Sequence, residues 1–213
     1  MQIINSTNQK LAHKRKGFTL IEMIGVLAVI AILASLLIPK IYEAINNARI
    51  SNTVLSYNTV KTALADHYAK YGSLASSNGV AFAAIPGPGS TNFDKVLVAE
   101  GFLDKPFQVK IGDLGTHIEV VNAASAATAP DGTATPAYDL DGNNAAANDC
   151  TGSYVVQAVI SNVSLGDAFA LSTLLDGATL SAANASVGSD DFRGRVRYAA
   201  TATTTVYIYV THR

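Results

Sequence analysis

The feature that most restricts what this chain can fold into is an uninterrupted apolar run near its N-terminus. Residues 18–38 read FTLIEMIGVLAVIAILASLLI, in which Thr19, Glu22 and Ser35 are the only polar side chains. As a helix rising 1.5 Å per residue, this run would be about 31 Å long, which matches the hydrocarbon core of a bilayer. It is too long for the apolar part of a secretory signal, and no small-residue cleavage site follows it. The sequence therefore predicts a membrane-spanning helix.

The charges on either side of the run predict its orientation. Lys14, Arg15 and Lys16 lie directly before it, and the cytoplasmic flanks of membrane helices are rich in such residues. We therefore expect a cytoplasmic N-terminus and a body that crosses the membrane. Of the 15 lysines and arginines four precede Phe18, whereas all 16 acidic residues follow it, so the body carries a net charge of about −5. An acidic body makes nucleic acid an unexpected direct partner.

Glu22 is the unusual residue of the span. A carboxylate near the centre of a membrane helix costs roughly 2.5–3.5 kcal/mol, and somewhat less this close to an end. Such a group usually has a partner, and the apolar run offers none. From the residues alone, Glu22 is either protonated or at the level of the lipid headgroups, or it has a partner outside the run.

The residues around Gly17 resemble a known processing motif. Residues 16–22 read KGFTLIE, and together with the apolar run up to Pro39 they are similar to the cleavage and methylation motif of type IV prepilins and type II secretion pseudopilins. The resemblance implies that a membrane-embedded prepilin peptidase cuts between Gly17 and Phe18 on the cytoplasmic side. It also implies N-methylation of the new Phe18 amine, polymerisation with copies of the same chain, and an inner-membrane assembly platform as a partner.

Cleavage at this position would give Glu22 a partner. Gly17 suits the scissile bond, because a residue without a side chain weakens a helix and leaves the backbone accessible. The new amine of Phe18 lies four residues before Glu22, on the same face of the helix. When subunits stack with an axial offset, the amine of one subunit reaches the carboxylate of its neighbour. We expect this pair to fix the register rather than to add much net stability.

The helix is expected to continue beyond the span. Pro39 either breaks it at the membrane surface or bends a continuous helix, and we favour the bend because helical character resumes at once. Residues 40–71 contain neither proline nor glycine, and Gly72 is a suitable C-cap. Two apolar stripes run along this segment at helical spacing. The first comprises Val54, Tyr57, Leu64, Tyr68 and Tyr71, and the second Ile41, Ala44, Ile45, Ala48 and Leu55.

The rest of the chain predicts a mixed head. Short helices are expected at 92–100 and from Ser164, as N-cap, to about Leu175, before Asp176-Gly177. A long loop is expected over 123–150. Strands are expected at 154–160 and in two hairpins, 108–111 with 116–122 and 195–200 with 204–211.

The fold class is therefore α+β, in which a long helical spine, half transmembrane and half amphipathic, carries a C-terminal antiparallel sheet in a pilin-like head. The expected divisions are a basic leader at 1–17, a transmembrane and assembly helix at 18–38, the amphipathic half of the spine at 39–71 and the head at 72–213.

One segment of the head has the composition of a cation site. Asp139, Asp141 and Asn143 place oxygen ligands at alternate positions, and Gly142 allows a sharp turn, as at the start of a calcium loop. The glutamate that completes such a loop is absent, so Asp149 or Asp190-Asp191 could contribute only through the fold. A solvated turn rich in Asp and Asn is the alternative.

The family resemblance implies a structural role for calcium. Many pilins pin their C-terminal loop with a disulfide, which a chain whose one cysteine is Cys150 cannot form internally, and major pseudopilins use calcium instead. Cys150 itself is expected to be a small buried residue or a tolerated one. Farther along, Arg193, Arg195 and Arg197 alternate, which predicts either a basic stripe for a partner or a solvated strand face.

No catalytic pattern is present in the sequence, and the four histidines are scattered without the spacing of a zinc site. We therefore expect no enzyme but a structural subunit of a type IV pilus-like filament. It would begin as a single-pass inner-membrane protein and end in an extracellular pilus. A periplasmic pseudopilus of a type II secretion system is the alternative machine. An uncleaved, membrane-anchored periplasmic binding domain is the alternative of a different class.

Overall fold

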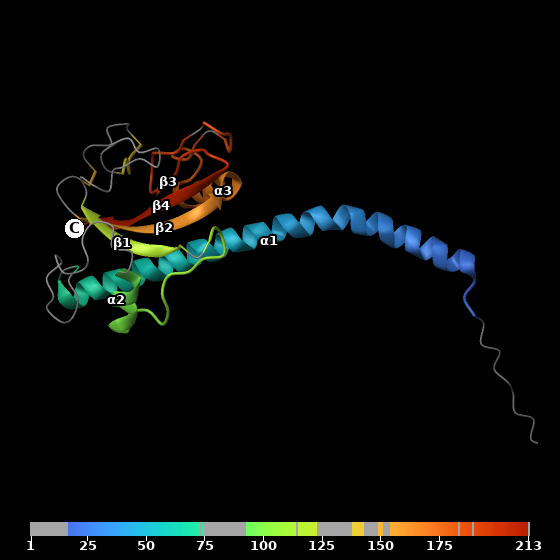
Figure 1. Cartoon of the computed structure of the whole chain (residues 1–213), viewed down its shortest axis with the longest axis horizontal. Helices are drawn as coiled ribbons and strands as arrows, with labels where there is room; N and C mark the ends of the chain where they lie inside the picture. Colours follow the sequence, from blue (N-terminus) through green and yellow to red (C-terminus); the bar gives the residue numbers. More distant parts are fainter. Residues whose placement is uncertain are drawn as a thin grey trace, which may run out of the picture. The chain divides into compact units, whose positions relative to one another are not determined.

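The computed structural model describes residues 17–72, 74, 93–113, 115–122, 138–142, 149–150, 154–182, 184–188 and 190–212. In chain order a long helix is followed by a head that contains a sheet and two short helices (Figure 1). The chain divides into two compact units, of which the first ends at Ala44 and the second begins at Ile45. This is the α+β architecture that the sequence predicts.

Helix α1 spans Leu20–Tyr71 and continues through Pro39. It ends where expected, because Gly72 takes a left-handed φ of 68° and its amide donates to the carbonyl of Tyr68 at 2.8 Å. Its most apolar 18-residue window has a mean hydropathy of 2.7 and no buried residue. Within the described residues α1 is the one helix long and apolar enough to cross a membrane. The helix is continuous at Pro39, so a break there is wrong, and the bend stays a prediction.

One face of α1 becomes buried from Ile50 onward. Apart from Ala63, which directly precedes Leu64, the buried positions recur at alternating intervals of three and four, which places them in a single seam along the helix. Tyr57 and Leu64 belong to this seam, as predicted, whereas Val54, Tyr68 and Tyr71 lie only half-buried at its edge. The second predicted stripe is exposed, and Leu55 is 65% exposed. The seam consists of Ile50, Thr53, Tyr57, Val60, Ala63, Leu64 and His67.

The head contains four antiparallel strands: β1 (His117–Asn122), β2 (Tyr154–Ser164), β3 (Val196–Arg197) and β4 (Thr203–His212). Their order is β1-β2-β4-β3. Side chains alternate between the two faces of a sheet, and one face packs against α1 in the main core. The central strands supply Val156, Ala158, Ile160, Val206, Ile208 and Val210 to that core.

The other face of the sheet carries a smaller cluster of buried residues. Cys150 lies there with Val121, Tyr138 and Val155. Burial raises the pKa of the Cys150 thiol to about 11, so the group stays protonated and unreactive at neutral pH. The expectation of a small buried residue is confirmed for Cys150.

The short helices follow their local signals. Helix α2 spans Phe93–Ala99, and the chain turns at Gly101 with a φ of 79°. Helix α3 spans Leu165–Asp176. The Ser164 hydroxyl caps it by accepting from the Asp167 amide at 3.2 Å, and Gly177 follows its last residue. The C-terminal hairpin is also confirmed, with β3 shorter than expected.

The predicted hairpin of 108–111 with 116–122 is wrong. Strand β1 instead pairs with β2, in a register that joins His117 to Val159. The residues before β1 pack on α2, since the Phe107 amide donates to Asp94 Oδ2 at 3.1 Å. Gly112 then passes so close to β2 that a Cβ there would lie 2.3 Å from the Ser161 carbonyl oxygen. A short β-branched pattern does not distinguish a neighbouring partner from a distant one. Most of the predicted loop 123–150 lies outside the described residues.

Candidate functional site

The predicted processing site lies at the start of α1. Gly17 and Phe18 precede the first helical residue, Leu20. Among the described residues, no atom beyond its chain neighbours lies within 4 Å of the position that a Cβ on Gly17 would occupy, and Phe18 is 80% exposed. No other part of the described chain therefore covers the peptide bond between them. The basic cluster Lys14-Arg15-Lys16 lies outside the described residues.

Glu22 has a local partner that sequence reasoning missed. Its Oε2 accepts from the Thr19 amide at 2.7 Å and from the Thr19 hydroxyl at 2.8 Å. In return the Glu22 amide donates to Thr19 Oγ1 at 3.3 Å. This is a capping box, in which the N-cap residue and the third helical residue satisfy each other's backbone donors. The pattern T-x-x-E directly before an apolar run is the signal that could have revealed it.

In the uncleaved chain, the capping box provides the partner that the Glu22 carboxylate needs. The carboxylate is hydrogen-bonded within the first turn, where the helix dipole also favours a negative charge. It does not depend on a second subunit at this stage. The next charges along α1 are Lys40 and Glu43, which form an exposed ion pair of 2.9 Å just after Pro39.

The fold brings three of the predicted acidic residues together. Ligand oxygens of Asp139, Asp141 and Asp149 all lie within 4.8 Å of one another, the one such group of three among the described residues. Asp149 Oδ2 accepts from the Leu140 amide at 2.6 Å and from the Asp141 amide at 3.2 Å. Asn143 lies outside the described residues.

This acidic cluster adjoins the segment that leads into β3. The Gly194 amide donates to the Asp139 carbonyl at 2.7 Å, and Asp139 and Arg193 form a parallel bridge. Asp190 and Asp191, also considered as ligands, are engaged elsewhere. Asp190 Oδ1 accepts from the Ala200 amide at 2.6 Å. A cation in the cluster would therefore lie beside the segment that leads into β3.

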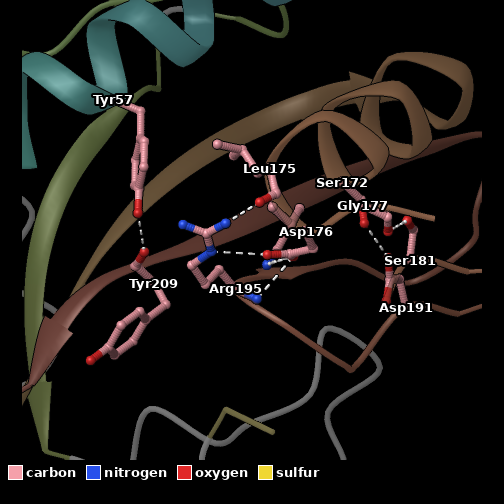
Figure 2. Close-up of polar contacts among 10 residues, drawn as sticks. Tyr57, Ser172, Leu175, Asp176, Gly177, Ser181, Asp191, Arg195 and Tyr209 are labelled. Carbon is pink, nitrogen blue, oxygen red and sulfur yellow. Dashed lines mark hydrogen bonds and ion pairs between the residues drawn. The ribbon is translucent and has the colours of Figure 1, made fainter. Parts of the chain in front are cut away.

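Asp176, the last residue of α3, fastens the start of β3 (Figure 2). Its Oδ2 accepts from the amides of Arg195 and Val196 at 2.9 and 2.7 Å. Its Oδ1 accepts from Arg195 Nε at 3.1 Å. The same guanidinium donates from Nη2 to the Leu175 carbonyl. We call this arrangement the Asp176 clasp; it closes the segment 177–195 at its two ends.

The clasp corrects the prediction of an arginine stripe. Arg195 turns toward Asp176, and Arg197 is buried, with its guanidinium 5.4 Å from the centre of the Tyr138 ring and 5.5 Å from that of Phe192. Alternation along a strand predicts a shared face, but it does not reveal that this face is covered. Neither a basic docking stripe nor a solvated face describes these two residues.

The carboxyl group of Asp191 also holds the segment 177–195 in place. Asp191 Oδ2 accepts from the Ser172 hydroxyl of α3 at 2.6 Å and from the Ala182 amide at 3.2 Å. Figure 2 shows Asp191 directed toward Ser172, beside the contact of the Ser181 hydroxyl with the Gly177 carbonyl. No local motif in the sequence indicates either Asp176 or Asp191 as a structural residue.

Comparison with known proteins agrees with the N-terminal motif. The family model described as the prokaryotic N-terminal methylation motif matches residues 12–38. The chain is 33% identical over 72 residues to the type IV major pilin protein PilE1 of Neisseria gonorrhoeae, which covers 34% of this chain and 44% of that protein. It is 34% identical over 64 residues to a fimbrial protein of Neisseria meningitidis serogroup A, covering 30% and 38% respectively.

These matches are partial. The chain spans about two fifths of the length of the curated relatives that it matches, and no solved structure matches it. The names of the relatives are those of structural proteins, which agrees with the expectation that the chain is not an enzyme.

Proposed function

We propose that this chain, which carries the N-terminal segment of the type IV prepilin family, is the structural subunit of a type IV pilus-like filament. The observation that carries the proposal is the start of α1. The Gly17–Phe18 bond precedes the exposed apolar part of α1, in which Glu22 of the first turn is the one carboxylate before Glu43. A helix of this kind has two environments that satisfy it, the bilayer and the flanks of other such helices.

The proposed sequence of events begins in the inner membrane. A prepilin peptidase removes residues 1–17 on the cytoplasmic side, and the exposed amine of Phe18 is N-methylated. An inner-membrane assembly platform then transfers the subunit from the lipid into the filament. The basic leader orients the precursor and is absent from the product.

In this proposal the Glu22 carboxylate has one partner in the precursor and another in the filament. Before cleavage the carboxylate is bound by Thr19. After cleavage the amine of a neighbouring subunit provides a full positive charge, which is a stronger partner in an apolar filament core. Because an unpaired charge in that core is costly, the pair selects the axial offset at which subunits meet.

Two machines use such a subunit. The Ala- and Thr-rich composition of residues 123–150 favours an exposed pilus, whereas a single cysteine, which cannot form an internal disulfide, favours the pseudopilus of a type II secretion system. We favour the pilus. Electron microscopy of cells with and without the gene distinguishes them, since surface fibres that depend on the gene support a pilus and fibres confined to the periplasm support a pseudopilus. A membrane-anchored binding protein would produce neither.

We propose in addition that the acidic cluster holds calcium. Carboxylate oxygens are the ligands that calcium prefers, and the cluster brings ligand oxygens of three carboxyl groups within 4.8 Å of one another, with Asp139 buried. Asp139, Asp141 and Asp149 would hold the ion, which would tie residues 138–142 and 149 together beside the segment that leads into β3.

Chelation should therefore destabilise the head. Calcium at about a hundredfold its dissociation constant stabilises a protein by about 2.7 kcal/mol, so we expect a chelator to lower the melting temperature by roughly 5–10 °C. The measurement is thermal unfolding of the full chain in detergent with calcium, with a chelator, and after calcium is restored. In the Asp149→Asn variant the chelator should have little further effect. A melting temperature indifferent to both calcium and chelator would exclude the site.

A further inference from the structure

A groove lies in the second unit of the chain, between α1 and the segment 103–110. Three hollows of about 140, 190 and 190 Å³ adjoin there, and Lys105 and Gln108 line all three of them. The hollows therefore form one continuous surface feature, which we call the Lys105 groove. Its wall on α1 is one side of the helix, with side chains at intervals of three and four. This wall includes Asn52, Leu55, Ser56 and Thr59.

The α1 wall of the Lys105 groove has the composition of the centre of an interface. The helix carries no charged residue between Arg49 and Lys61, although Asn52 and Thr59 are exposed and Leu55 is 65% exposed. The exposed face of a helix in water is normally polar and charged, whereas the centres of protein–protein interfaces are depleted of charge. The wall therefore has the character of a surface that another molecule covers.

Two lysines give the opposite side of the groove a positive charge. Lys105 and Lys110 are exposed, and within the described residues neither forms an ion pair. They are the charged residues of the hollow that contains Leu55. Asp104 and Asp113 line the two outer hollows. The middle of the groove is therefore basic, and its occupant should carry carboxylates.

The carboxylates that match this groove are on the other part of the same chain. Residues 45–113 contain six lysines and arginines and five acids, whereas residues 114–213 contain four and nine. Two acids of the first part, Asp94 and Glu100, are buried, which leaves its surface more basic still. In the second part Asp141 and Asp190 are exposed. The two parts of one copy are therefore complementary in charge to those of another.

We propose that the Lys105 groove receives the acidic part of a second copy of this chain, with Lys105 and Lys110 opposite carboxylates of residues 114–213. A contact that joins two different surfaces of identical subunits leaves one of each free on the outer copies, so it propagates into a filament unless it closes into a ring. The complementary charges fix how neighbouring copies meet. This inference rests on the proposed filament and adds a contact that the apolar part of α1 does not provide.

Zero-length cross-linking of sheared wild-type filaments tests the contact itself. A carbodiimide joins a lysine to a carboxylate only where the two groups touch. We expect covalent dimers on a denaturing gel, in which mass spectrometry finds Lys105 or Lys110 joined to a carboxylate of residues 114–213, with Asp141 and Asp190 the expected partners. Dimers without a link at either lysine, links only to carboxylates of residues 45–113, or links only to another protein overturn the proposal.

Reversing the charge of both lysines tests what the contact contributes to assembly. The double variant Lys105→Glu, Lys110→Glu should reduce the recovered filaments about tenfold or more, because like charges then face each other. Its melting temperature should not change, since both side chains are exposed. The matched control is Lys95→Glu, because Lys95 is an exposed lysine of α2 that lines none of the three hollows. Normal assembly of the double variant, or an equal loss in the control, contradicts the proposal.

The processing of the chain separates this inference from the proposed function. In the double variant the leader should still be removed, so the membrane should contain a monomer that begins at Phe18. Wild-type cells that form no filaments, or in which the chain keeps its leader, contradict the proposed function. Wild-type filaments together with normal filaments from the double variant contradict the role of the Lys105 groove alone.

Discussion

Replacing Glu22 with alanine is expected to abolish filaments while leaving the head folded. In the assembled state the substitution leaves the amine of the neighbouring Phe18 without a carboxylate in an apolar core, and removing one partner of a buried ion pair costs about 3–5 kcal/mol. A loss of this size at every subunit contact would prevent polymerisation. The head contains no part of this pair, so its melting temperature should not change. Filaments are counted by electron microscopy or recovered by shearing.

Glu22→Gln separates the two roles of this side chain. Glutamine also serves in a capping box, so the contacts with Thr19 at the start of α1 are retained and only the charge is lost. We expect this variant to lack filaments too. The matched control is Glu43→Ala, because Glu43 is an acid of the same helix whose ion pair with Lys40 is exposed and therefore worth less than about 1 kcal/mol. Normal filaments from Glu22→Gln would show that the charge of Glu22 does not drive assembly.

Replacing Asp176 with alanine is expected to give the largest loss of stability in the head. The side chain is 1% exposed and accepts from two backbone amides and from the Arg195 guanidinium. Its removal leaves these donors without acceptors, and each such buried group costs about 1–3 kcal/mol. Arg195 is 39% exposed and can be hydrated in part, so we expect a loss of about 3 kcal/mol, or roughly 6–12 °C in melting temperature.

The control for the Asp176 clasp is Asp190→Ala. Asp190 lies in the same segment and accepts one backbone hydrogen bond, from Ala200, but it is exposed. We expect it to cost less than about 1 kcal/mol. Equal losses for the two variants in thermal unfolding would mean that the clasp is no more important than any other hydrogen bond of the segment.

The Asp176 clasp also explains why residue 194 is a glycine. Gly194 has a φ of 75°, and a Cβ there would lie 2.6 Å from Asp176 Oδ2. The position therefore requires a residue that tolerates a left-handed conformation and has no side chain. Sequence alone shows a glycine between two arginines and gives no reason for it.

The parts of the fold that the sequence predicts correctly are those with local signals. Helix α3 lies between a serine that accepts from its third residue and a glycine that follows its end. The long helix follows from composition and from the absence of helix-breaking residues after Pro39. The motif at Gly17 is local too, and the cleavage that it implies stays a prediction.

Apart from the local capping box of Thr19 and Glu22, the missed features depend on contacts between distant segments. The partner of β1 lies in β2, where His117 pairs with Val159, and the sequence between the two strands has no pattern that indicates this pairing. His67 was not expected in the seam of α1, because its burial depends on Glu100, whose carboxylate lies 2.6 Å from Nδ1. The roles of Asp176 and Asp191 likewise arise only when α3 meets the approach to β3.

The central claim is that an exposed apolar helix leaves the lipid to pack against its own copies once the residues before Phe18 are gone. Mass spectrometry and N-terminal sequencing of the chain from sheared, purified filaments test it most directly. The account predicts a single species that begins at N-methylated Phe18. A chain that still carries Lys14, Arg15 and Lys16, whether recovered from filaments or only as a monomer in the membrane, would contradict it.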